Sequence, residues 1–359
     1  MTDRARAIMA TRRAKSALTQ TQKRKKEHLE LCLDTERVAS PSTTGLEAYR
    51  FVHNALPELD IDEIDIGADF LGKRLRAPIL ISSMTGGFDL ARKVNRNLAA
   101  AAQTLGLAMG VGSQRVAVEE PSAESTFQVR DVAPDILLFG NLGAVQLNYG
   151  YGIEQCRRAA AMIGADGLIL HLNVLQEAVQ IEGNRNFKGL TAKIAAVCRE
   201  LDLPVIAKEV GNGISVDVAE RLQRAGVAAI DIAGKGGTSW SAVEAQRAAK
   251  RGGRADTAFI DWGIPTEEAL ISVRKALPDM PLIASGGIRT GVDIAKSIAL
   301  GANLAALGQP LLESALESAD KVVELLAGVI HELKVSMLCV GAKDLGELRR
   351  VSLARVGRP

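Results

Sequence analysis

The stretch PLIASGGIRTGVDIAKSIALGANLAALG, residues 281–308, carries the pattern that decides the fold. Two short apolar runs, Pro281–Ser285 and Leu304–Gly308, flank an Ala-rich segment with helical periodicity over Gly291–Leu300. Both runs are almost continuously apolar, as is typical of strands that are buried on both faces. A strand, a helix and a second strand in this order predict one unit of a parallel sheet.

The same alternation begins near residue 77 and continues along the chain. The other predicted strands are Ala77–Met84, Ala108–Ser113, Asp135–Asn141, Gly167–Asn173, Pro204–Val210 and Ala228–Ala233. The other predicted helices include Asn95–Leu105, Ile153–Ile163, Val216–Ala225 and Thr266–Ala276. Eight strands separated by helices predict an α/β fold, a closed parallel (β/α)8 TIM barrel. The alternative is an open doubly wound sheet, which more naturally shows an early GxGxxG turn and an acid at the end of the next strand; the sequence has neither.

The segments outside this alternation suggest how the chain is organised. Residues 1–76 precede the first strand and are expected to form an N-terminal arm and a cap segment. Residues 77–359 are expected to form the barrel with its C-terminal helices. Within that part, residues 311–348 are predicted to be a helical tail that begins with the run Leu311–Ile330.

Composition excludes several classes of protein. The 359 residues are 47% hydrophobic and 24% charged, which is typical of a globular chain with a large core. No apolar run approaches the roughly 20 residues of a membrane span, and the N-terminus has no apolar signal-peptide core. We therefore expect a cytoplasmic protein without a membrane partner. The four cysteines show no CxxC or metal-finger spacing and are expected to be buried free thiols.

The charge is unevenly distributed. Residues 1–26 hold nine Lys or Arg against one acid, which makes this segment +8 and leaves −6 for the rest of a chain whose net charge is +2. A basic arm could bind nucleic acid, imitate a transit peptide, reach a phosphate-bearing ligand, or be a solvated tail. Because this arm lacks aromatic residues for base stacking and the body is acidic, no nucleic-acid partner is expected.

In barrel enzymes the active site lies at the C-terminal ends of the strands. In this chain polar, Gly-flanked segments follow all eight predicted strands. In strand order they are Ser82–Gly87, Gly112–Arg115, Gly140–Gly143, His171–Glu177, Lys208–Gly211, Gly234–Trp240, Ser285–Arg289 and Ala306–Gln309. Stability alone gives no reason for such a repeated placement, so the sequence predicts a site that all eight loops share.

The loops after the last three strands predict a bound phosphate. Gly286 and Gly287 follow the seventh strand, and glycine lets backbone N–H groups approach an anion closely. Arg289 adds a charged donor, and the Gly-Gly-Thr of residues 236–238 supplies a second small-residue loop. Lys208, at the end of the fifth strand, suits an electron-rich flavin edge or an anionic ligand, or alternatively a salt bridge with Glu209 or another acid.

The fourth strand supplies a candidate metal ligand and a candidate histidine. Glu177 suits Mg²⁺, which proteins usually hold with one or two carboxylates together with substrate phosphates, and Gln176 adds a neutral amide beside it. His171 and Asn173 share one face of the strand by the alternation of side chains. A hydrogen-bonded core residue is the alternative for His171.

The basic element Arg24-Lys25-Lys26-Glu27-His28 lies well before the barrel. One interpretation is a solvated charge run. The other is a flexible arm that closes over the site and neutralises a diphosphate.

From about Arg24 to the C-terminal helix the chain resembles the type 2 isopentenyl-diphosphate isomerases, which are flavoenzymes. The motifs are RKxxH (24–28), SMTGG (83–87), GSQR (112–115), NLG (141–143), HLNxxQE (171–177), KEVG (208–211), GxGGT (234–238) and SGGIR (285–289). Each motif is common, but all eight in this order are highly specific.

The resemblance implies the role of each site residue. The substrate diphosphate is held by Arg24, Lys25, Ser113, Gln114 and Arg115, with His28 supporting the arm. FMN contacts Met84, Thr85, Gly86, Ser113, Asn141, Lys208 and Thr238, and its phosphate lies among Gly286, Gly287, Arg289, Ala306 and Leu307. Glu177 binds Mg²⁺, and His171, Asn173 and Gln176 are the expected catalytic residues, with Gln176 also binding substrate.

The implied reaction converts isopentenyl diphosphate into dimethylallyl diphosphate by a 1,3-allylic proton shift without net redox change. Carboxylates are few among the candidates, because Glu177 is assigned to the metal and Glu209 is the other. The resemblance accordingly implies that reduced FMN itself acts as acid and base, that NADPH serves only to reduce it, and that the enzyme is a homo-oligomer, a tetramer or octamer.

The main alternative is an FMN-dependent 2-hydroxy-acid oxidoreductase of the same barrel class. Such enzymes use a histidine base after strand six or seven, and those loops contain none in this chain. An enzyme like inosine-monophosphate dehydrogenase needs a nucleophilic cysteine after strand six, but the four cysteines lie elsewhere.

Overall fold

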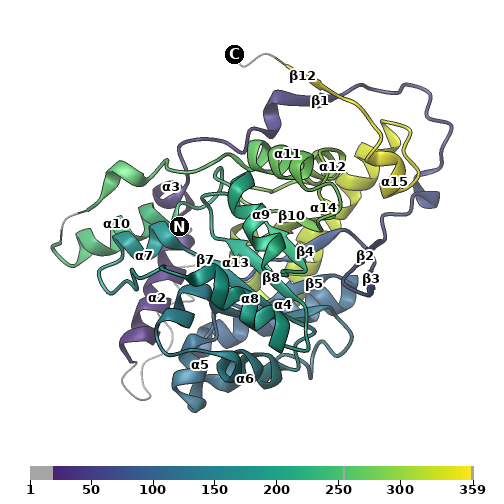
Figure 1. The fold of residues 1–359 in the computed structure, drawn as a ribbon. Helices are drawn as coiled ribbons and strands as arrows, with labels where there is room; N and C mark the ends of the chain where they lie inside the picture. The colour runs from purple at the N-terminus through teal and green to yellow at the C-terminus, as the bar shows by residue number, and fades with distance from the viewer. Residues whose placement is uncertain (1–18, 254, 357–359) are drawn as a thin grey trace.

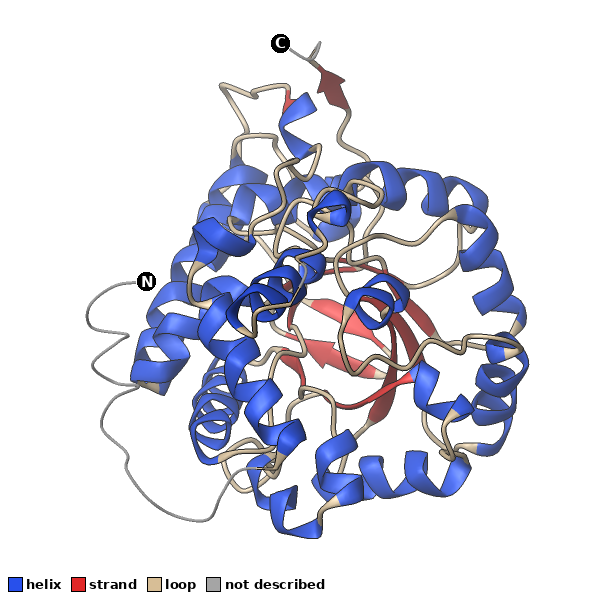
Figure 2. Ribbon diagram, turned by 90° about the vertical axis from the view of Figure 1, so that its left-hand side faces the viewer, coloured by secondary structure: helices blue, strands red, loops and turns tan. Residues whose placement is uncertain are grey.

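The computed structural model describes residues 19–253 and 255–356. Eight parallel strands form a closed barrel in the order β10-β11-β4-β5-β6-β7-β8-β9, so the predicted fold class is confirmed. The strands are β4 (Ile79–Ile81), β5 (Ala108–Gly110), β6 (Leu138–Gly143), β7 (Gly167–Leu172), β8 (Val205–Glu209), β9 (Ala229–Asp231), β10 (Leu282–Ala284) and β11 (Leu304–Leu307). Figure 2 shows these strands in red inside a ring of helices.

The barrel closes where the last strand pairs with the first, with Ala305 opposite Ile79 and Leu307 opposite Ile81. All eight predicted strands are present, and most are shorter than predicted because their polar ends turn into loops. The third is displaced: the sequence predicts Asp135–Asn141, and the strand runs over Leu138–Gly143. Asp135 is exposed and exchanges two hydrogen bonds with Gln103, so this part of the chain lies at the surface before the strand enters the core.

Helices surround the barrel between successive strands. They are α4 (Asp89–Leu105), α5 (Arg115–Glu119), α6 (Ile153–Ile163), α7 (Val174–Val179), α8 (Leu190–Glu200), α9 (Val216–Arg224), α10 (Trp240–Lys250), α11 (Thr266–Ala276) and α12 (Gly291–Ala299). The predicted bounds of α6 and α11 are confirmed. Helix α4 starts six residues earlier than predicted, since Ala91 and Val94 continue its buried face.

The C-terminal helical tail is interrupted where the sequence predicts a continuous run. Helix α13 (Leu312–Glu317) ends at Ser318, and α14 (Ala319–Leu338) begins immediately after it. The Ser318 hydroxyl accepts a hydrogen bond from the Lys321 N–H, which caps the new helix. Within residues 19–253 and 255–356, no helix combines the length and the apolar character needed to cross a bilayer.

The residues before the barrel reach both of its ends. Helix α2 (Gln20–Cys32) is followed by α3 (Thr35–Val38), β1 (Tyr49–Phe51) and the hairpin of β2 (Ala68–Phe70) and β3 (Lys73–Leu75). Strand β1 pairs with β12 (Leu353–Arg355), far from α2, which lies beside α10 (Figure 1). Lys73 donates to Ile136 O, just before β6, whereas Gln22 of α2 donates to Gly87 O, beyond the end of β4. The hairpin therefore lies at the N-terminal end of the barrel and α2 at the C-terminal end.

Candidate active site

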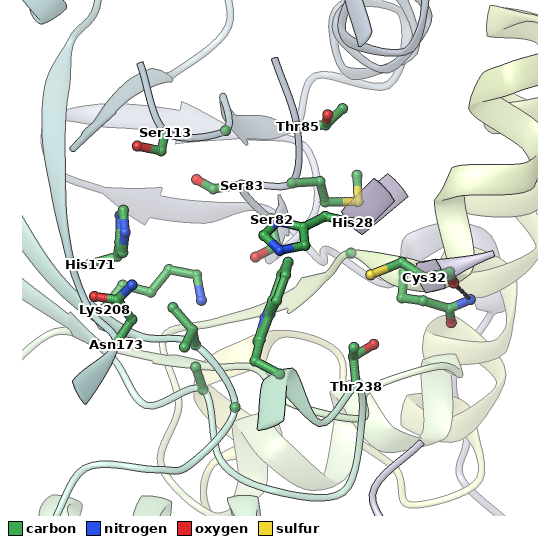
Figure 3. Close-up of a pocket in the computed structure, with 18 of the residues that line it drawn as sticks. His28, Cys32, Ser82, Ser83, Thr85, Ser113, His171, Asn173, Lys208 and Thr238 are labelled. Carbon is green, nitrogen blue, oxygen red and sulfur yellow. Dashed lines mark hydrogen bonds between the residues drawn. The ribbon is translucent and has the colours of Figure 1, made fainter. Parts of the chain in front are cut away.

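A cavity of about 260 Å³ lies at the C-terminal ends of the strands. Loops after all eight strands contribute to its wall, and α2 supplies a further wall through Arg24, Lys25, His28, Leu29 and Cys32. In Figure 3, Ser83, His171, Lys208 and Thr238 lie around this space. Because parallel strands all end at the same rim, loops that are far apart in sequence meet there.

Most residues singled out from the sequence line the cavity. They are Arg24, Lys25, His28, Met84, Thr85, Ser113, Arg115, Asn141, His171, Asn173, Gln176, Glu177, Lys208, Thr238, Gly286, Gly287, Arg289 and Ala306. Gln114, Gly86 and Leu307 are not among its lining residues.

Those three residues lie directly behind the wall. Gln114 is fully buried; its Nε2 donates to Ala159 O (2.7 Å) and its Oε1 accepts from Asn141 N (2.9 Å), so it supports β6 and Asn141. A Cβ at Gly86 would stand 1.9 Å from the ring of Phe127, so this glycine allows close packing. Leu307 is fully buried in the barrel.

Two adjacent glycines after β10 form a cradle of backbone donors. Gly286 and Gly287 have φ of +94° and +83°, values that favour glycine. A Cβ at Gly286 would lie 1.9 Å from Gly234 O, and one at Gly237 would lie 2.6 Å from Gly287 N. Within the described chain, no hydrogen bond engages the N–H groups of Gly286, Gly287 or Ile288. Such a loop fits a phosphate group.

Lys208 lies at the rim beside a buried carboxylate from the next strand. Its Nζ donates to Glu209 O (2.6 Å) and lies 3.7 Å from Asp231 Oδ2, while Asp231 Oδ1 accepts from Ser285 Oγ (2.5 Å). The Glu209 carboxylate instead accepts three backbone N–H groups, those of residues 210–212. The predicted salt bridge of Lys208 with Glu209 or another acid is therefore confirmed, and the acid is Asp231 and not Glu209.

Burial dominates the titration of both carboxylates near Lys208. It raises the pKa of Glu209 to about 7 although three backbone hydrogen bonds and the charge of Lys208 act in the other direction. Burial also raises the pKa of Asp231, against the charge of Lys208 and the Ser285 hydrogen bond.

His171 is neutral and oriented by Asn141. Burial, and then the charges of Lys208 and Lys25, lower its pKa to about 3. Its Nδ1 lies 2.7 Å from Asn141 Oδ1, an acceptor, so Nδ1 carries the proton and Nε2 is left as an acceptor. His171 thus forms a hydrogen bond, as its alternative interpretation required, and also faces the cavity.

Two buried polar atoms at the cavity wall have no hydrogen-bond partner in the described chain. They are Ser83 Oγ and Asn173 Oδ1. Because buried polar groups are nearly always paired in native proteins, these atoms are available to a polar ligand. Together with the glycine cradle and Lys208, they fit a large phosphate-bearing cofactor such as FMN.

The α2 side of the cavity gathers positive charge. Lys25 Nζ donates to Ser113 O (2.5 Å) and stands 5.1 Å from the centre of the Phe127 ring. Burial, and then the charge of Arg24, lower the pKa of Lys25 to about 7. Burial, and then the charge of Arg115, lower the pKa of Arg24. Arg24 and Lys25 thus face the cavity, where their charges suit an anion, whereas Lys26 of the same run is exposed to solvent.

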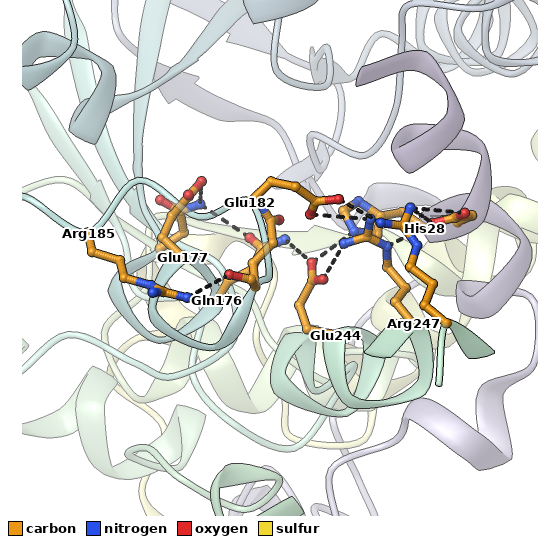
Figure 4. A network of polar contacts seen from close by, with 11 residues as sticks. His28, Gln176, Glu177, Glu182, Arg185, Glu244 and Arg247 are labelled. Atoms are coloured by element: carbon orange, nitrogen blue, oxygen red, sulfur yellow. Dashed lines mark hydrogen bonds and ion pairs between the residues drawn. The ribbon is translucent and has the colours of Figure 1, made fainter. Parts of the chain in front are cut away.

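Opposite them, Glu177 belongs to a network of polar contacts (Figure 4). Its Oε1 accepts from Asn173 Nδ2 (3.2 Å) and its Oε2 from Asn184 N (2.5 Å). Across residues 19–253 and 255–356, no group of three or more His, Cys, Asp or Glu could hold a metal ion. A cation at Glu177 would therefore take most of its oxygen ligands from a bound anion and water, as Mg²⁺ commonly does.

Sequence reasoning assigned no role to three residues of this region. Glu244 accepts from His28 Nε2 (2.8 Å) and Gln176 Nε2 (3.3 Å), and the Trp240 ring meets the His28 ring edge-on at 5.3 Å. Asp231 is the third. An acid inside the apolar strand Ala228–Ala233 was a usable signal for Asp231, because a buried charge needs a partner. Glu244 lies on a helix and gave no such signal.

The expectation of free thiols is confirmed, and that of burial holds for two of the four cysteines. All four cysteines are free; Cys32 and Cys156 are buried, and Cys198 and Cys339 are half-buried.

Comparison with known proteins places this site in a family. The pattern of the FMN-dependent dehydrogenase family matches residues 166–355, just over half of the chain. Among solved structures, a mandelate oxidase superposes with a TM-score of 0.65 at 20% identity, covering 94% of this chain and 99% of that one. A putative lactate oxidase from Pediococcus acidilactici superposes with a TM-score of 0.61 at 18% identity, covering 97% of each. These structures show the shared fold.

The barrel and its cradle define a protein of the FMN-dependent dehydrogenase class. The isopentenyl-diphosphate delta-isomerase of Nostoc sp. is 53% identical over 92% of this chain and 95% of its own length. That of Stutzerimonas stutzeri is 52% identical over 93% of this chain and 97% of its own. The chain belongs to the isopentenyl-diphosphate delta-isomerase family.

Proposed function

We propose that this protein is an enzyme that interconverts isopentenyl diphosphate and dimethylallyl diphosphate with reduced FMN and Mg²⁺. One observation carries the proposal: a single cavity holds both a glycine cradle that suits one phosphate and a separate cluster of half-buried cations that suits a second anion. Membership of the isopentenyl-diphosphate delta-isomerase family supports this choice of reaction.

Each ligand has residues that would hold it. Gly286, Gly287 and Arg289 would surround the FMN phosphate, and Lys208 would lie at the ring system. Arg24, Lys25 and Arg115 would hold the substrate diphosphate, and Glu177 would hold Mg²⁺. Reduced FMN, when bound, would supply an acid–base group beside the apolar tail of the substrate. No carboxylate of the chain then needs to reach that tail.

The chain's own contribution is to orient the substrate and exclude water. Leu29, Cys32, Met84, Trp240 and Leu312 give the cavity apolar walls that suit a five-carbon tail. Neutral His171 presents Nε2 as an acceptor and adds no positive charge where a cationic tail would form. A dry wall protects such an intermediate from capture by water.

The direct test is an anaerobic assay on the purified full-length protein. We expect bound flavin in the absorbance spectrum, and allylic isomerisation of isopentenyl diphosphate once the flavin is reduced. Reduction by NADPH and by dithionite should support equal turnover if NADPH serves only as reductant. A protein that retains no FMN, or that holds reduced FMN and does not isomerise the substrate, contradicts the proposal. Native mass spectrometry would test the expected tetramer or octamer.

The first prediction concerns pH. Below about pH 7 Lys25 is charged and attracts the diphosphate, and above it the neutral amine does not, because its pKa lies near 7. We therefore expect kcat/KM, which reports the free enzyme, to fall as pH rises from about 7 to about 9. The substrate phosphates are already ionised there and do not cause the fall.

The Lys25→Met variant is the control for this effect. It should have a lower kcat/KM at pH about 6 and lack the decline above pH about 7. FMN content should stay constant throughout. A decline that persists unchanged in Lys25→Met assigns the titration to another group.

The second prediction concerns the metal. Glu177→Gln keeps the shape of the side chain and removes its charge, so the Mg²⁺ concentration for half-maximal activity should rise at least about tenfold while FMN stays bound. Glu154→Gln removes an exposed carboxylate on α6 and should leave the Mg²⁺ titration unchanged. A wild-type Mg²⁺ titration in Glu177→Gln would exclude Glu177 as the metal ligand.

A further inference from the structure

The guanidinium of Arg247, on α10, joins three carboxylates from three parts of the chain. Its Nε donates to Glu27 Oε2 of α2 (3.0 Å), and its Nη1 donates to Glu244 Oε2 of α10 (2.5 Å). Its Nη2 lies 3.7 Å from Glu182 Oε2, in the loop that follows α7 and Glu177. The Arg247 side chain is only 2% exposed, and Figure 4 shows it between Glu182, Glu244 and His28.

Arg247 supplies the positive charge that balances the Glu244 carboxylate, because the neighbouring His28 is neutral. Burial by itself would raise the pKa of Glu244, but the His28 hydrogen bond and the charge of Arg247 outweigh it and lower that pKa. Burial lowers the pKa of His28 despite its bond to Glu244, which favours the neutral ring at pH 7. The positive charge that pairs with the Glu244 carboxylate therefore comes from Arg247.

Helix α2 has few apolar contacts, so polar contacts such as this one hold much of its length. Only Leu29, Leu31 and Cys32, all in its last turn, are buried hydrophobic residues. Its N-terminal half instead carries Arg24 and Lys25 toward a cavity that already contains Arg115, and these cations repel one another. A 13-residue helix with a small apolar face is marginal on its own.

We propose that Arg247 is a positioning residue, which ties α2 to α10 and to the loop after Glu177 so that the arm cations and the metal ligand face the same diphosphate. This inference rests on the proposed function for the identity of that ligand. Arg247 does not line the cavity, so it acts through Glu27, Glu244 and Glu182.

The contact between Arg247 and Glu182 is longer than a hydrogen bond and could shorten. Arg247 Nη2 and Glu182 Oε2 are both buried, and neither has a hydrogen-bond partner in the described chain. They stand 3.7 Å apart, so a shift of about 0.8 Å would bring them to an ordinary hydrogen-bond length of about 2.9 Å. The Arg247 guanidinium is thereby one of the links between α2 and the loop beyond Glu177.

The chain offers a matched control in Arg251, one turn further along. Arg251 pairs with the same two carboxylates, Glu27 (3.0 Å) and Glu182 (2.6 Å), but it lies at the surface with 35% of its side chain exposed and does not contact Glu244. Exposed ion pairs contribute little, whereas a broken buried pair leaves an uncompensated charge. Removing either arginine changes the net charge equally.

The experiment compares Arg247→Met, Arg247→Lys, Glu27→Gln and Arg251→Met in the full-length holoenzyme. At saturating Mg²⁺ we expect Arg247→Met to raise the KM for isopentenyl diphosphate at least about tenfold with kcat within about threefold. Glu27→Gln should shift KM in the same direction, Arg247→Lys should be intermediate because an ammonium lacks the planar fork, and Arg251→Met should stay within about twofold. FMN content should be equal in all.

Limited trypsin digestion supplies a readout that needs no substrate. Cleavage at residues 24–26 should be slow in the wild type and at least about tenfold faster in Arg247→Met and Glu27→Gln. Equal effects of Arg247→Met and Arg251→Met, or unchanged KM and protection in Arg247→Met and Glu27→Gln, would overturn the inference. If Arg247→Met does not fold, Glu27→Gln decides alone. If the wild type does not isomerise the substrate, the proposed function fails. The digestion still tests whether Arg247 holds α2 against α10.

Discussion

Replacing Arg24 with Met raises the KM for isopentenyl diphosphate at least about 100-fold and leaves FMN bound. A guanidinium can grip a diphosphate with two charge-assisted hydrogen bonds, and losing about 2.7 kcal/mol of such binding is a 100-fold loss of affinity. In the amide orientation that satisfies both neighbours, Gln180 accepts from Arg24 Nη1 (3.1 Å) and donates to Glu244 Oε1 (3.1 Å), so Arg24 is already held in place for its ligand. Steady-state kinetics at saturating Mg²⁺, with FMN content from the absorbance spectrum, checks this.

Lys26→Met is the matched control for this result. It removes one positive charge from the same helix, but Lys26 is 46% exposed and pairs only loosely with Glu30 at 3.7 Å. Its KM should remain within about twofold of the wild type, because an exposed charge is screened by solvent and salt. If both variants shift KM equally, the arm acts as a diffuse positive field and not as a ligand for the diphosphate.

Replacing Gly286 with Ala abolishes stable FMN retention. The new Cβ would stand 1.9 Å from Gly234 O, which is backbone, so the loop itself must move, and with it the N–H groups of residues 286–288. We expect the dissociation constant for FMN to rise at least about 100-fold, as fits the loss of several oriented donors to one phosphate. Equilibrium titration of reconstituted apoprotein with FMN measures this.

Gly72→Ala separates steric clash from backbone strain. Gly72, in the β2–β3 hairpin, has φ +82°, close to that of Gly286, but a Cβ added there would have nothing within 4 Å. The substitution should lower the free energy of unfolding by about 1 kcal/mol and leave FMN binding unchanged. Loss of FMN in Gly72→Ala as well would mean that Gly286→Ala acts by general destabilisation and not through the cradle.

Local pattern was enough to predict the barrel. The spacing of apolar residues over about ten positions indicates whether a helix or a strand would bury them on one face. The bounds of α6 and α11 were therefore predictable. The break at Ser318 was not, because Leu311–Ile330 has no proline or glycine before Gly328 to mark it, and the cap depends on one hydroxyl geometry.

The site could be predicted from the fold because active sites of barrel enzymes lie at the C-terminal ends of the strands. Once the strands are assigned, the residues after each must meet at one end of the barrel, which brought His171, Lys208 and Gly286 to one cavity. The rule cannot say which way a side chain points. Gln114 follows a strand as Ser113 does, yet it faces inward and bonds Ala159.

By itself, the order of residues along this chain determined the β/α alternation, the polar loops at the strand ends and the family to which they belong. Only the tertiary structure decided the partners: Asp231 for Lys208, Glu244 for His28, and Arg247 between Glu27 and Glu244. The physical reason is separation. His28 and Glu244 lie 216 residues apart, and a buried charge finds its counter-charge by proximity in space, which no local pattern encodes.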